Sequence, residues 1–235
     1  MRATALLWSV IIIMASLGCQ SIQRPEAEQQ PKRVIVFGVD DTGSYKLWNQ
    51  AKNMALQVIQ QLQPGDIFYC RRINEASYLD DSIIFRLELP CVDNANIDNP
   101  FDRRSKRLLR SRMGQINRIK REAYEKMAAI LPTNAGRTDI NGFFAAAMDR
   151  FSVASKEYQR VLIIASDLQE NVNYNVELDL KGVQVLVLGF QTTEDPAETQ
   201  RLKNKWIETF TRAGVGKVLF LSPEESFRAH YLQGA

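Results

Sequence analysis

The sequence predicts a three-layer, doubly wound α/β domain whose mainly parallel sheet carries one antiparallel edge strand. Three runs, at 34–39, 161–167 and 183–189, are apolar almost throughout and lack polar alternation, which is typical of strands buried on both faces. Segments with helical spacing alternate with these runs, as in βαβ units. Two more strand-like segments, 67–70 and 82–89, follow each other without a helix between them, which favours an antiparallel hairpin. This order of elements indicates an α/β architecture.

Length and composition fit one domain of ordinary size with extensions. The chain has 235 residues, of which 45% are hydrophobic and 24% are charged, enough for a full core. The formal charge of +3 is small, although the basic residues are unevenly distributed. The chain has one histidine, His230, which argues against His-based zinc sites and against Ser-His or Cys-His nucleophiles.

The first 18 residues have the pattern of a secretory signal rather than of a folded segment. Arg2 precedes an apolar run from Ala5 to Met14, too short for a membrane span, and small residues then lead to Cys19. This order resembles a bacterial lipoprotein signal, which implies that Cys19 is lipidated and becomes the new N-terminus. We therefore expect a cell-envelope protein, anchored in the outer membrane or on the outer face of the cytoplasmic membrane. An ordinary cleaved signal and an uncleaved anchor are the alternatives.

Residues 19–32 are expected to form a flexible tether, and the domain is expected over 33–235. The tether segment is polar, contains Pro25 and Pro31 and shows no apolar period. As a random coil its ends would lie about 20 Å apart.

The first half of the domain begins with a strand at 34–39 and a helix that Pro64 and Gly65 close. The hairpin strands at 67–70 and 82–89 follow, separated by a polar loop. The apolar residues that recur at helical spacing are Leu47, Ala51, Ala55, Val58 and Leu62.

One helical pattern then runs from 103 to 131 and would be roughly 43 Å long at 1.5 Å per residue. A typical strand is about half that length, so we expect the helix to overhang the sheet or to break at Gly114. The helix is strongly basic, and its basic patch consists of Arg103, Arg104, Lys106, Arg107 and Arg110. Such a run binds nucleic acid, anionic lipid or an acidic partner, or is simply a solvated helix face.

Topology indicates which of these partners to expect. An antiparallel strand at 82–89 ends at the sheet edge opposite Asp40, so the helix that begins at Arg103 must start there. The tether joins the same edge to Cys19. We therefore expect the basic patch to face lipid headgroups or an acidic membrane partner, and we do not expect nucleic acid as a partner.

The second half of the chain repeats the alternation of helices and strands. Pro132 ends the long helix, and Ser222 to Glu225 form a capping box that opens a short final helix. Between these points the sequence predicts a helix at about 139–151, strands at 161–167 and 183–189, a helix at 196–213 and a strand at 217–221.

Oxygen-bearing side chains gather where two buried strands end. Asp40 follows the first strand, with Thr42 and Ser44 at the next alternate positions, and Gly43 lets the loop fold sharply. Asp167 ends the strand that begins at 161. Ligands of open α/β sheets bind beyond the carboxyl ends of strands. Such oxygens suit one hard divalent cation, Mg²⁺ or else Mn²⁺ or Ca²⁺.

These residues resemble the von Willebrand factor A (vWA) domain family over roughly residues 33–221. The family's metal-ion-dependent adhesion site has Asp-x-Ser-x-Ser after the first strand, a Thr before a middle helix and an Asp after the fourth strand. Asp40, Thr42 and Ser44 match the first element, Thr138 the second and Asp167 the third. The family usually has Gly after this Asp, where this chain has Leu168.

The resemblance implies a binding role in which a Glu or Asp of a protein ligand completes the metal's coordination. An enzyme is not expected, because Asp41, Asp139 and Glu170 are expected to cap helices or face solvent rather than act as general bases. Thr138 has an alternative role as a helix N-cap. The alternative functions are a metal-dependent hydrolase (phosphatase or nuclease), a scaffold without metal, and an aspartic protease, since residues 41–44 spell its Asp-Thr-Gly-Ser motif.

Two cysteines remain after Cys19, and in an exported protein they are able to form a disulfide. Pairing the hairpin strands places Cys70 near Phe85 or Arg86, so Cys91 lies several residues beyond. A Cys70–Cys91 bridge would require the chain to bend back after Pro90.

Overall fold

The computed structural model describes residues 31–92, 103–172, 176–190 and 195–228. The chain divides into two compact units, Met1–Gln30 and Pro31–Ala235, and all described residues belong to the second. The expected signal at 1–18, Cys19 and most of the 19–32 tether therefore lie outside the described residues.

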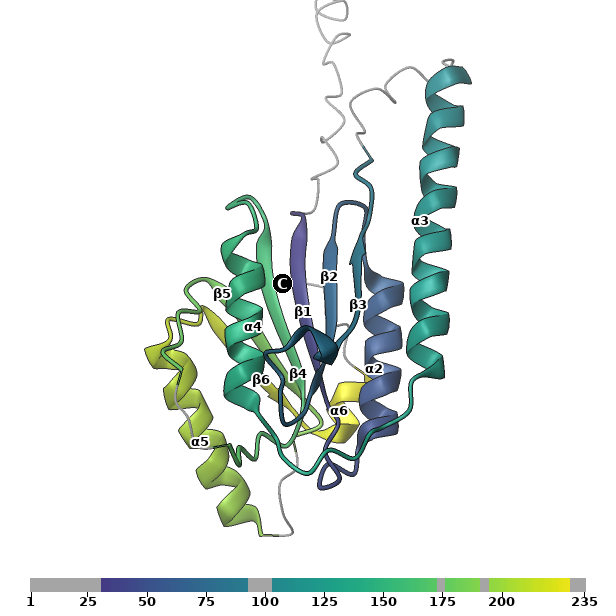
Figure 1. Ribbon diagram of the computed structural model, residues 1–235. Helices are drawn as coiled ribbons and strands as arrows, with labels where there is room; N and C mark the ends of the chain where they lie inside the picture. Colours follow the sequence, from purple (N-terminus) through teal and green to yellow (C-terminus); the bar gives the residue numbers. More distant parts are fainter. Residues whose placement is uncertain (1–30, 93–102, 173–175, 191–194, 229–235) are drawn as a thin grey trace, which may run out of the picture. The chain divides into compact units, whose positions relative to one another are not determined.

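A single six-stranded sheet forms the centre of the second unit (Figure 1). The strands are β1 (Arg33–Asp40), β2 (Ile67–Ile73), β3 (Ile83–Glu88), β4 (Gln159–Ala165), β5 (Val183–Leu188) and β6 (Lys217–Leu221). Their order is β3-β2-β1-β4-β5-β6; β3 is antiparallel to β2 and the other pairs are parallel. The strand order reverses between β1 and β4, so the carboxyl ends of these two strands flank the switch point. The mainly parallel sheet and its antiparallel edge strand are confirmed.

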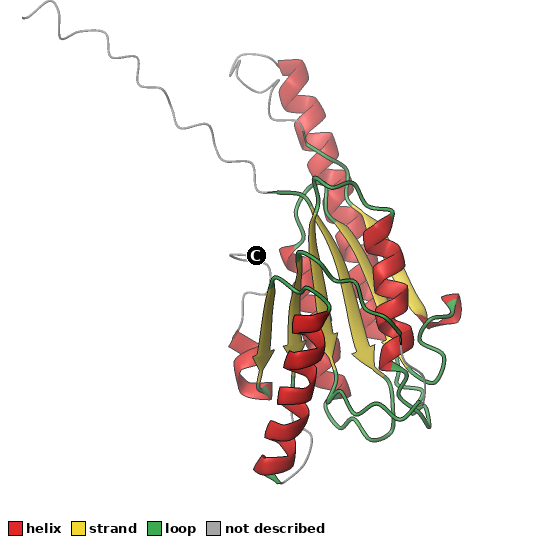
Figure 2. Cartoon of the chain, turned by 90° about the vertical axis from the view of Figure 1, so that its left-hand side faces the viewer, coloured by secondary structure: helices red, strands yellow, loops and turns green. Residues whose placement is uncertain are grey.

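Helices cover both faces of the sheet and complete the three layers (Figure 2). They are α2 (Trp48–Gln61), α3 (Arg103–Ala129), α4 (Ile140–Ser152), α5 (Pro196–Arg212) and α6 (Pro223–Arg228), with a short 3₁₀ turn η1 (Asp80–Ser82) in the β2–β3 connection. α2 and α3 pack on one face, and α4 and α5 on the other. In the described part of the chain, no helix is long and apolar enough to cross a membrane.

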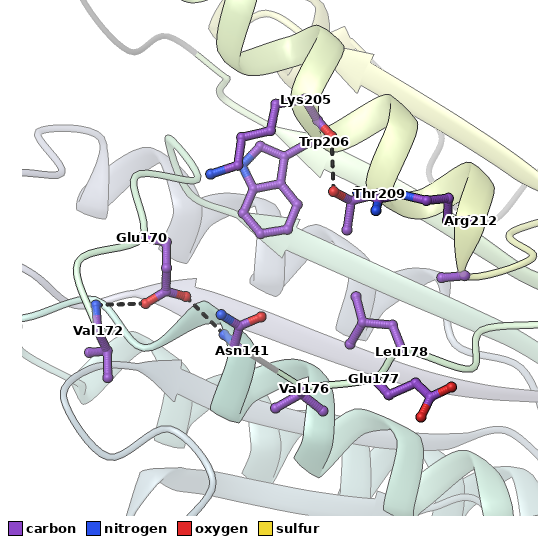
Figure 3. Close-up of a pocket in the computed structure, with 11 residues that line it drawn as sticks. Asn141, Glu170, Val172, Val176, Glu177, Leu178, Lys205, Trp206, Thr209 and Arg212 are labelled. Carbon is purple, nitrogen blue, oxygen red and sulfur yellow. Dashed lines mark hydrogen bonds between the residues drawn. The ribbon is translucent and has the colours of Figure 1, made fainter. Parts of the chain in front are cut away.

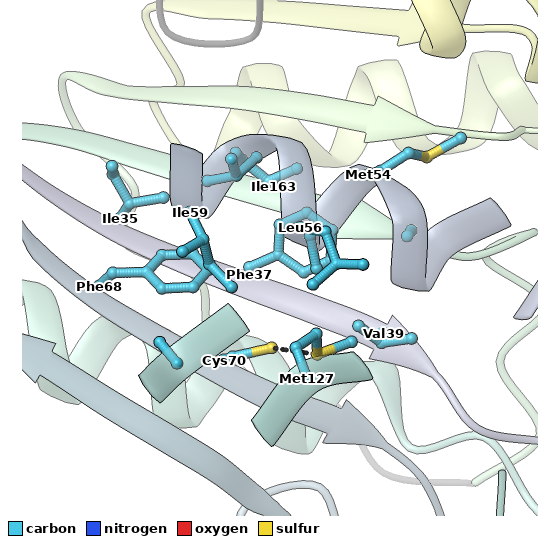
Figure 4. Packing of buried hydrophobic residues seen from close by; sticks show 14 of the residues in the cluster. Ile35, Phe37, Val39, Met54, Leu56, Ile59, Phe68, Cys70, Met127 and Ile163 are labelled. Carbon is cyan, nitrogen blue, oxygen red and sulfur yellow. Dashed lines mark hydrogen bonds between the residues drawn. The ribbon is translucent and has the colours of Figure 1, made fainter. Parts of the chain in front are cut away.

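Side chains of β1 alternate between two hydrophobic clusters, one on each face of the sheet. Ile35, Phe37 and Val39 join the cluster beneath α2 and α3 (Figure 4), whereas Val34 and Val36 join the cluster beneath α4 and α5. Because both faces are covered, the residues between Arg33 and Asp40 face a hydrophobic cluster on either side of the sheet, which explains the unbroken apolar run. Each such side chain contributes about 1.5–3 kcal/mol by leaving water.

The long basic helix α3 is continuous and overhangs the sheet, as one of the two sequence-based expectations stated. It passes through Gly114 without a break, and it extends past the strands at the end where β1 begins (Figure 1). Its buried residues are Ile116, Ala123 and Met127, all in the C-terminal half. The C-terminal half is therefore the part that packs on the domain.

Two lysines tie α3 to α2 reciprocally. Lys52 of α2 donates to the Ala128 carbonyl (3.2 Å) at the end of α3, and Lys120 of α3 donates to the Gln60 carbonyl (2.6 Å) at the end of α2. Carbonyls at a helix C-terminus lack partners within the helix, and a cation stabilises them. Each helix thus caps its antiparallel neighbour.

The two described cysteines are free thiols, so the structure does not contain the Cys70–Cys91 bridge that the sequence allows. Cys70 is opposite Phe85, as the hairpin pairing predicts, and it is buried under α3 with its sulfur 4.0 Å from that of Met127. Cys91 lies beyond the end of β3, and its carbonyl accepts a hydrogen bond from Arg112 (2.9 Å). The Cys91 sulfur lies near Gly65, before β2 begins, whereas Cys70 pairs with Phe85 farther along the strand, so the two thiols stay apart.

Candidate metal centre

The register of the sheet brings the first and last predicted ligands to neighbouring strand ends. Asp40 is the last residue of β1, and Val39 pairs with Ala165 of β4, so Asp40 lies beside Ser166. β4 ends at Ala165, two residues earlier than the sequence predicted, and Asp167 therefore belongs to the following loop. Both carboxylates are buried, with exposures of 0% and 6%.

The loop after β1 brings three oxygen-bearing side chains together. Thr42 donates to Asp40 Oδ1 from its backbone N–H (3.1 Å) and from its hydroxyl (2.7 Å), and its hydroxyl lies 3.0 Å from that of Ser44. Ser44 is exposed, whereas Thr42 is buried. The N–H of Gly43 donates to the Ala135 carbonyl (3.2 Å), which joins this loop to the α3–α4 connection.

Ser166 is a residue of this centre that the sequence analysis missed. Its hydroxyl donates to Asp40 Oδ2 (2.5 Å) and accepts from the N–H of Leu168 (2.9 Å). Asp40 therefore receives hydroxyl hydrogen bonds on both of its oxygens. The signal was present as a hydroxyl residue directly before Asp167, but its contact with β1 depends on the strand register.

Thr138 is not the helix N-cap that its alternative role required. Asp139 is the N-cap of α4, because its carboxylate accepts from the Gly142 N–H (2.7 Å). Thr138 is buried, and its backbone pairs with Asn171, four residues past Asp167, through two hydrogen bonds of 2.7 and 3.3 Å. Its hydroxyl makes no hydrogen bond to any described residue. The structure thus joins the loop of Thr138 to the loop of Asp167.

Asp41 lies inside the domain, so the expectation that it caps a helix or faces solvent is wrong. Its carboxylate forms an ion pair with Arg72 and accepts from the backbone N–H (2.8 Å) and the hydroxyl (2.6 Å) of Thr133. Arg72 also donates to the Leu131 carbonyl (3.1 Å). These contacts fix the α3–α4 connection against the ends of β1 and β2.

Glu170 caps a helix, as expected. Its carboxylate accepts from the backbone N–H groups of Ile140 (2.8 Å) and Asn141 (2.9 Å) at the start of α4. Carboxylates at this position satisfy N–H groups that lack partners within the helix. Glu170 therefore holds the loop after β4 against α4.

Leu168, where the vWA family usually has Gly, adopts the backbone conformation that favours glycine. Its φ is 59°, in the left-handed region, which costs a non-glycine residue about 1–2 kcal/mol. The side chain is fully buried in the cluster beneath α4 and α5, and its carbonyl accepts from the indole N–H of Trp206 (3.0 Å). Burial of the leucine offsets the strain, so the loop keeps a glycine-like turn.

Burial makes the charged forms of Asp40 and Asp167 unfavourable. It raises the pKa of Asp40, and hydrogen bonds from Ser166 and Thr42 oppose this shift. It also raises the pKa of Asp167 to about 6, and the charge of Asp40 adds to this effect. Neither carboxylate forms an ion pair with a described lysine or arginine. Two buried acids, one of which accepts hydrogen bonds from two hydroxyls, form a donor set that fits a hard divalent cation.

Within the described residues, no three or more His, Cys, Asp or Glu side chains form a metal-ligating group. The expected donor set contains two acids, and its other members are hydroxyls. A cavity of about 930 Å³ lies elsewhere, between the start of α4, the loop after β4 and α5 (Figure 3). Its lining includes Asn141, Glu170 and Trp206 but none of the five predicted ligands.

The comparisons with known proteins give a likeness of fold. No protein-family model and no curated protein matches the chain. Among solved structures, the chain is similar to proximal thread matrix protein 1 of the mussel byssus, with a TM-score of 0.51 and 15% identity over 83% of this chain and 45% of that one. The chain therefore spans less than half the length of that protein.

Two further structures are similar at lower TM-scores. One is a von Willebrand factor type A protein from Catenulispora acidiphila (TM-score 0.40, 15% identity, 84% of this chain and 36% of that one). The other is an aerotolerance-related membrane protein from Bacteroides fragilis (TM-score 0.46, 12% identity, 84% of this chain and 100% of that one). The strand order and the single antiparallel edge strand give this chain a doubly wound α/β fold.

Proposed function

We propose that this chain is a lipid-anchored binding protein of the bacterial cell envelope. Its vWA-like domain engages a protein ligand through one divalent cation at the carboxyl edge of the sheet. The observation that carries the proposal is the pair Asp40 and Asp167. Both are buried, Asp40 at the end of β1 and Asp167 in the loop that follows the neighbouring β4. The hydroxyls of Thr42 and Ser166 donate to Asp40, and neither acid forms an ion pair with a described cationic side chain.

In this proposal each predicted ligand has one role. Asp40 and Asp167 supply the negative charge, while Thr42, Ser44 and Thr138 supply neutral oxygens. Mg²⁺, or alternatively Mn²⁺ or Ca²⁺, would neutralise the acids and attract one further anionic oxygen. A Glu or Asp of the ligand provides that oxygen.

We propose no catalytic activity at this site. The nearby acids Asp41, Asp139 and Glu170 all accept backbone N–H hydrogen bonds, so they serve as structural acceptors rather than as general bases. The fold argues against an aspartic protease, because the Asp-Thr-Gly-Ser sequence follows a parallel strand and leads into α2. No observation favours a hydrolase or a metal-free scaffold.

Calorimetric titration with Mg²⁺ and with Mn²⁺ tests the metal assignment. The wild-type protein should bind one ion, and Asp40→Asn should weaken the binding, because it removes a charge with little change of shape. The matched control is Asp81→Asn, which removes an exposed charge in η1 and should bind as the wild type does. Equal affinity of Asp40→Asn and wild type would refute the assignment.

Cell fractionation tests the anchor separately. Lipidated Cys19 should place the protein in the membrane fraction, and Cys19→Ser should release it. Intact-mass analysis of the membrane-bound protein should show an N-terminal lipidated cysteine. An unmodified Cys19 would reject the anchor and leave the metal assignment untouched.

A pulldown from envelope extracts tests the protein ligand. The wild-type protein with Mg²⁺ should retain a protein that is lost with chelator or with Asp40→Asn, while Asp81→Asn should retain it. If the captured protein is retained equally well with chelator and by Asp40→Asn, it binds outside the metal centre.

A further inference from the structure

α3 has a projecting segment, residues 103–115, that contributes no buried side chain. Every residue of this segment is exposed or half-buried, and burial begins at Ile116. Figure 1 shows this part of α3 (teal) extending past the strands. A helix gains most of its stability in proteins from packing of one face. The projecting segment lacks this packing within the domain.

The outward side of α3 carries a regular stripe of arginines. With 3.6 residues per turn, positions 103, 107, 110, 118 and 121 lie along one side of the helix, opposite the buried Ile116, Ala123 and Met127. The arginine stripe is Arg103, Arg107, Arg110, Arg118 and Arg121, all exposed. It is about 27 Å long at 1.5 Å per residue.

The stripe differs from an ordinary solvated helix face in having no acidic neighbours. From 103 to 121 the sequence contains no Asp or Glu, and Glu122 is the first acid. Solvated faces usually intersperse both signs at i,i+4 spacing, which stabilises the helix. None of the five arginines forms an ion pair within the described part of the chain. The stripe is therefore an exposed surface of uncompensated positive charge.

The projecting segment lies beside the point where the chain enters the domain. Arg112 holds the Cys91 carbonyl (2.9 Å), and a Cβ placed on Gly65 would lie 3.3 Å from the Cys91 sulfur and 3.2 Å from the Lys32 side chain. Lys32 directly precedes β1, so the base of the projecting segment and the start of β1 meet at one end of the sheet. Asp40 is at the opposite end of β1.

We propose that the arginine stripe is a docking surface for the anionic headgroups of a lipid bilayer. The proposal rests on the proposed lipid anchor only for its location, because the tether would bring this end of the domain to the membrane. Charge complementarity supplies the attraction, which is screened by salt. The metal centre then faces away from the bilayer toward its ligand.

Exposed apolar side chains among the basic residues of the helix favour lipid over nucleic acid or an acidic protein. Met113 (38% exposed) lies one turn from Arg110 at the edge of the stripe, and Leu108 (55% exposed) lies about 100° around the helix from Arg107. Apolar groups among basic residues suit the boundary between headgroups and acyl chains. They gain nothing from contact with phosphate in water.

Vesicle flotation with the second unit, residues 31–235, tests the proposal without the anchor. This unit contains the whole sheet and both hydrophobic clusters, so it is suited to separate expression. The vesicles are pure phosphatidylcholine or phosphatidylcholine with phosphatidylglycerol, at low and high salt. The stripe variant is Arg103→Gln, Arg107→Gln and Arg110→Gln. The matched control is Arg201→Gln, Lys205→Gln and Arg212→Gln, three exposed cations of α5.

The wild-type unit and the α5 control should bind the anionic vesicles at low salt and leave them at high salt. The stripe variant should bind on the order of a hundred-fold more weakly, since each basic residue at an anionic surface contributes about five-fold. Circular dichroism should show unchanged helix content. Equal binding by the stripe variant and the control would overturn the proposal.

Binding of the same proteins to double-stranded DNA is measured for comparison with vesicle binding. Binding to DNA that exceeds vesicle binding and falls with the stripe variant would replace the lipid assignment with a nucleic-acid one. Absence of vesicle binding by the wild-type unit would also reject the stripe as a lipid surface. Because the unit lacks Cys19, neither result bears on lipidation, and metal titration of the same variants reports the metal centre independently.

Discussion

The raised pKa of Asp167 predicts that the metal-free protein becomes more stable on mild acidification. Burial holds this pKa at about 6 in the folded state, against 3.8 for an unperturbed aspartate. The folded protein therefore binds more protons than the unfolded chain between about pH 4 and 6. The contribution of Asp167 to the free energy of unfolding is therefore present at low pH and is lost as the pH rises through about 6.

The magnitude is set by the size of the shift. Each pKa unit corresponds to about 1.4 kcal/mol, so the full contribution of this group is about 3 kcal/mol. Between pH 7 and pH 5 about 1.3 kcal/mol of it is gained, because the folded-state group protonates while the unfolded chain stays charged. For a domain of this size, that raises the melting temperature by about 3–5 °C.

Thermal melting in chelator at pH 7 and pH 5 measures this effect against Asp167→Asn. The amide does not titrate, so the pH dependence of the variant's melting temperature comes from the other titrating groups. The difference between the pH dependences of the two proteins is therefore the contribution of Asp167. The variant should be the more stable protein at pH 7, and the gap should narrow at pH 5. The same pH dependence in both proteins, or a gap that widens on acidification, would refute the account of the buried carboxylates.

Three further outcomes are expected. Leu168→Gly should be more stable than Leu168→Ala by about 1 kcal/mol in chemical denaturation, because only glycine relieves the left-handed backbone; the usual order, alanine above glycine, would contradict the strained turn. Met127→Ala should cost about 2–5 kcal/mol and Met113→Ala less than about 0.5 kcal/mol, and similar costs would mean that the projecting segment is packed. A thiol reagent should modify Cys91 in the native protein and Cys70 only after unfolding, because burial raises the pKa of Cys70 and hides its sulfur; modification of both at equal rates would count against that burial.

Those features of the fold that depend on local pattern were predictable from the sequence. Unbroken apolar runs identified strands buried on both faces, and the lack of a helix between β2 and β3 identified the antiparallel pair. The capping box also formed as expected, with Ser222 and Glu225 exchanging hydrogen bonds of 2.8 and 3.3 Å. Asp40, Thr42 and Ser44 lie together because they share one short loop.

Features that depend on contacts between distant segments were not predictable. The hydrogen bond from Ser166 to Asp40 joins residues 126 positions apart and requires the β1–β4 register. β2 continues past its predicted end at residue 70, through Arg71 and Arg72, to Ile73. Arg71 is 1% exposed because its guanidinium donates to three carbonyls of the following loop. Asp41 is buried for the same kind of reason, since its partner Arg72 comes from another strand.

The reciprocal lysine caps and the buried residues fix the length of the C-terminal part of α3. The length of the projecting segment is not constrained by these contacts. One residue inserted between Lys120 and Met127 would turn one of them by 100° relative to the other, so either the cap on α2 or the buried methionine would be lost. An insertion before Arg112 leaves the core and the hydrogen bond from Arg112 to the Cys91 carbonyl in place and changes how far the helix reaches. Sequences with this fold are thus free to lengthen or shorten the projecting segment by whole turns, and so to adjust its reach, at no cost to the core.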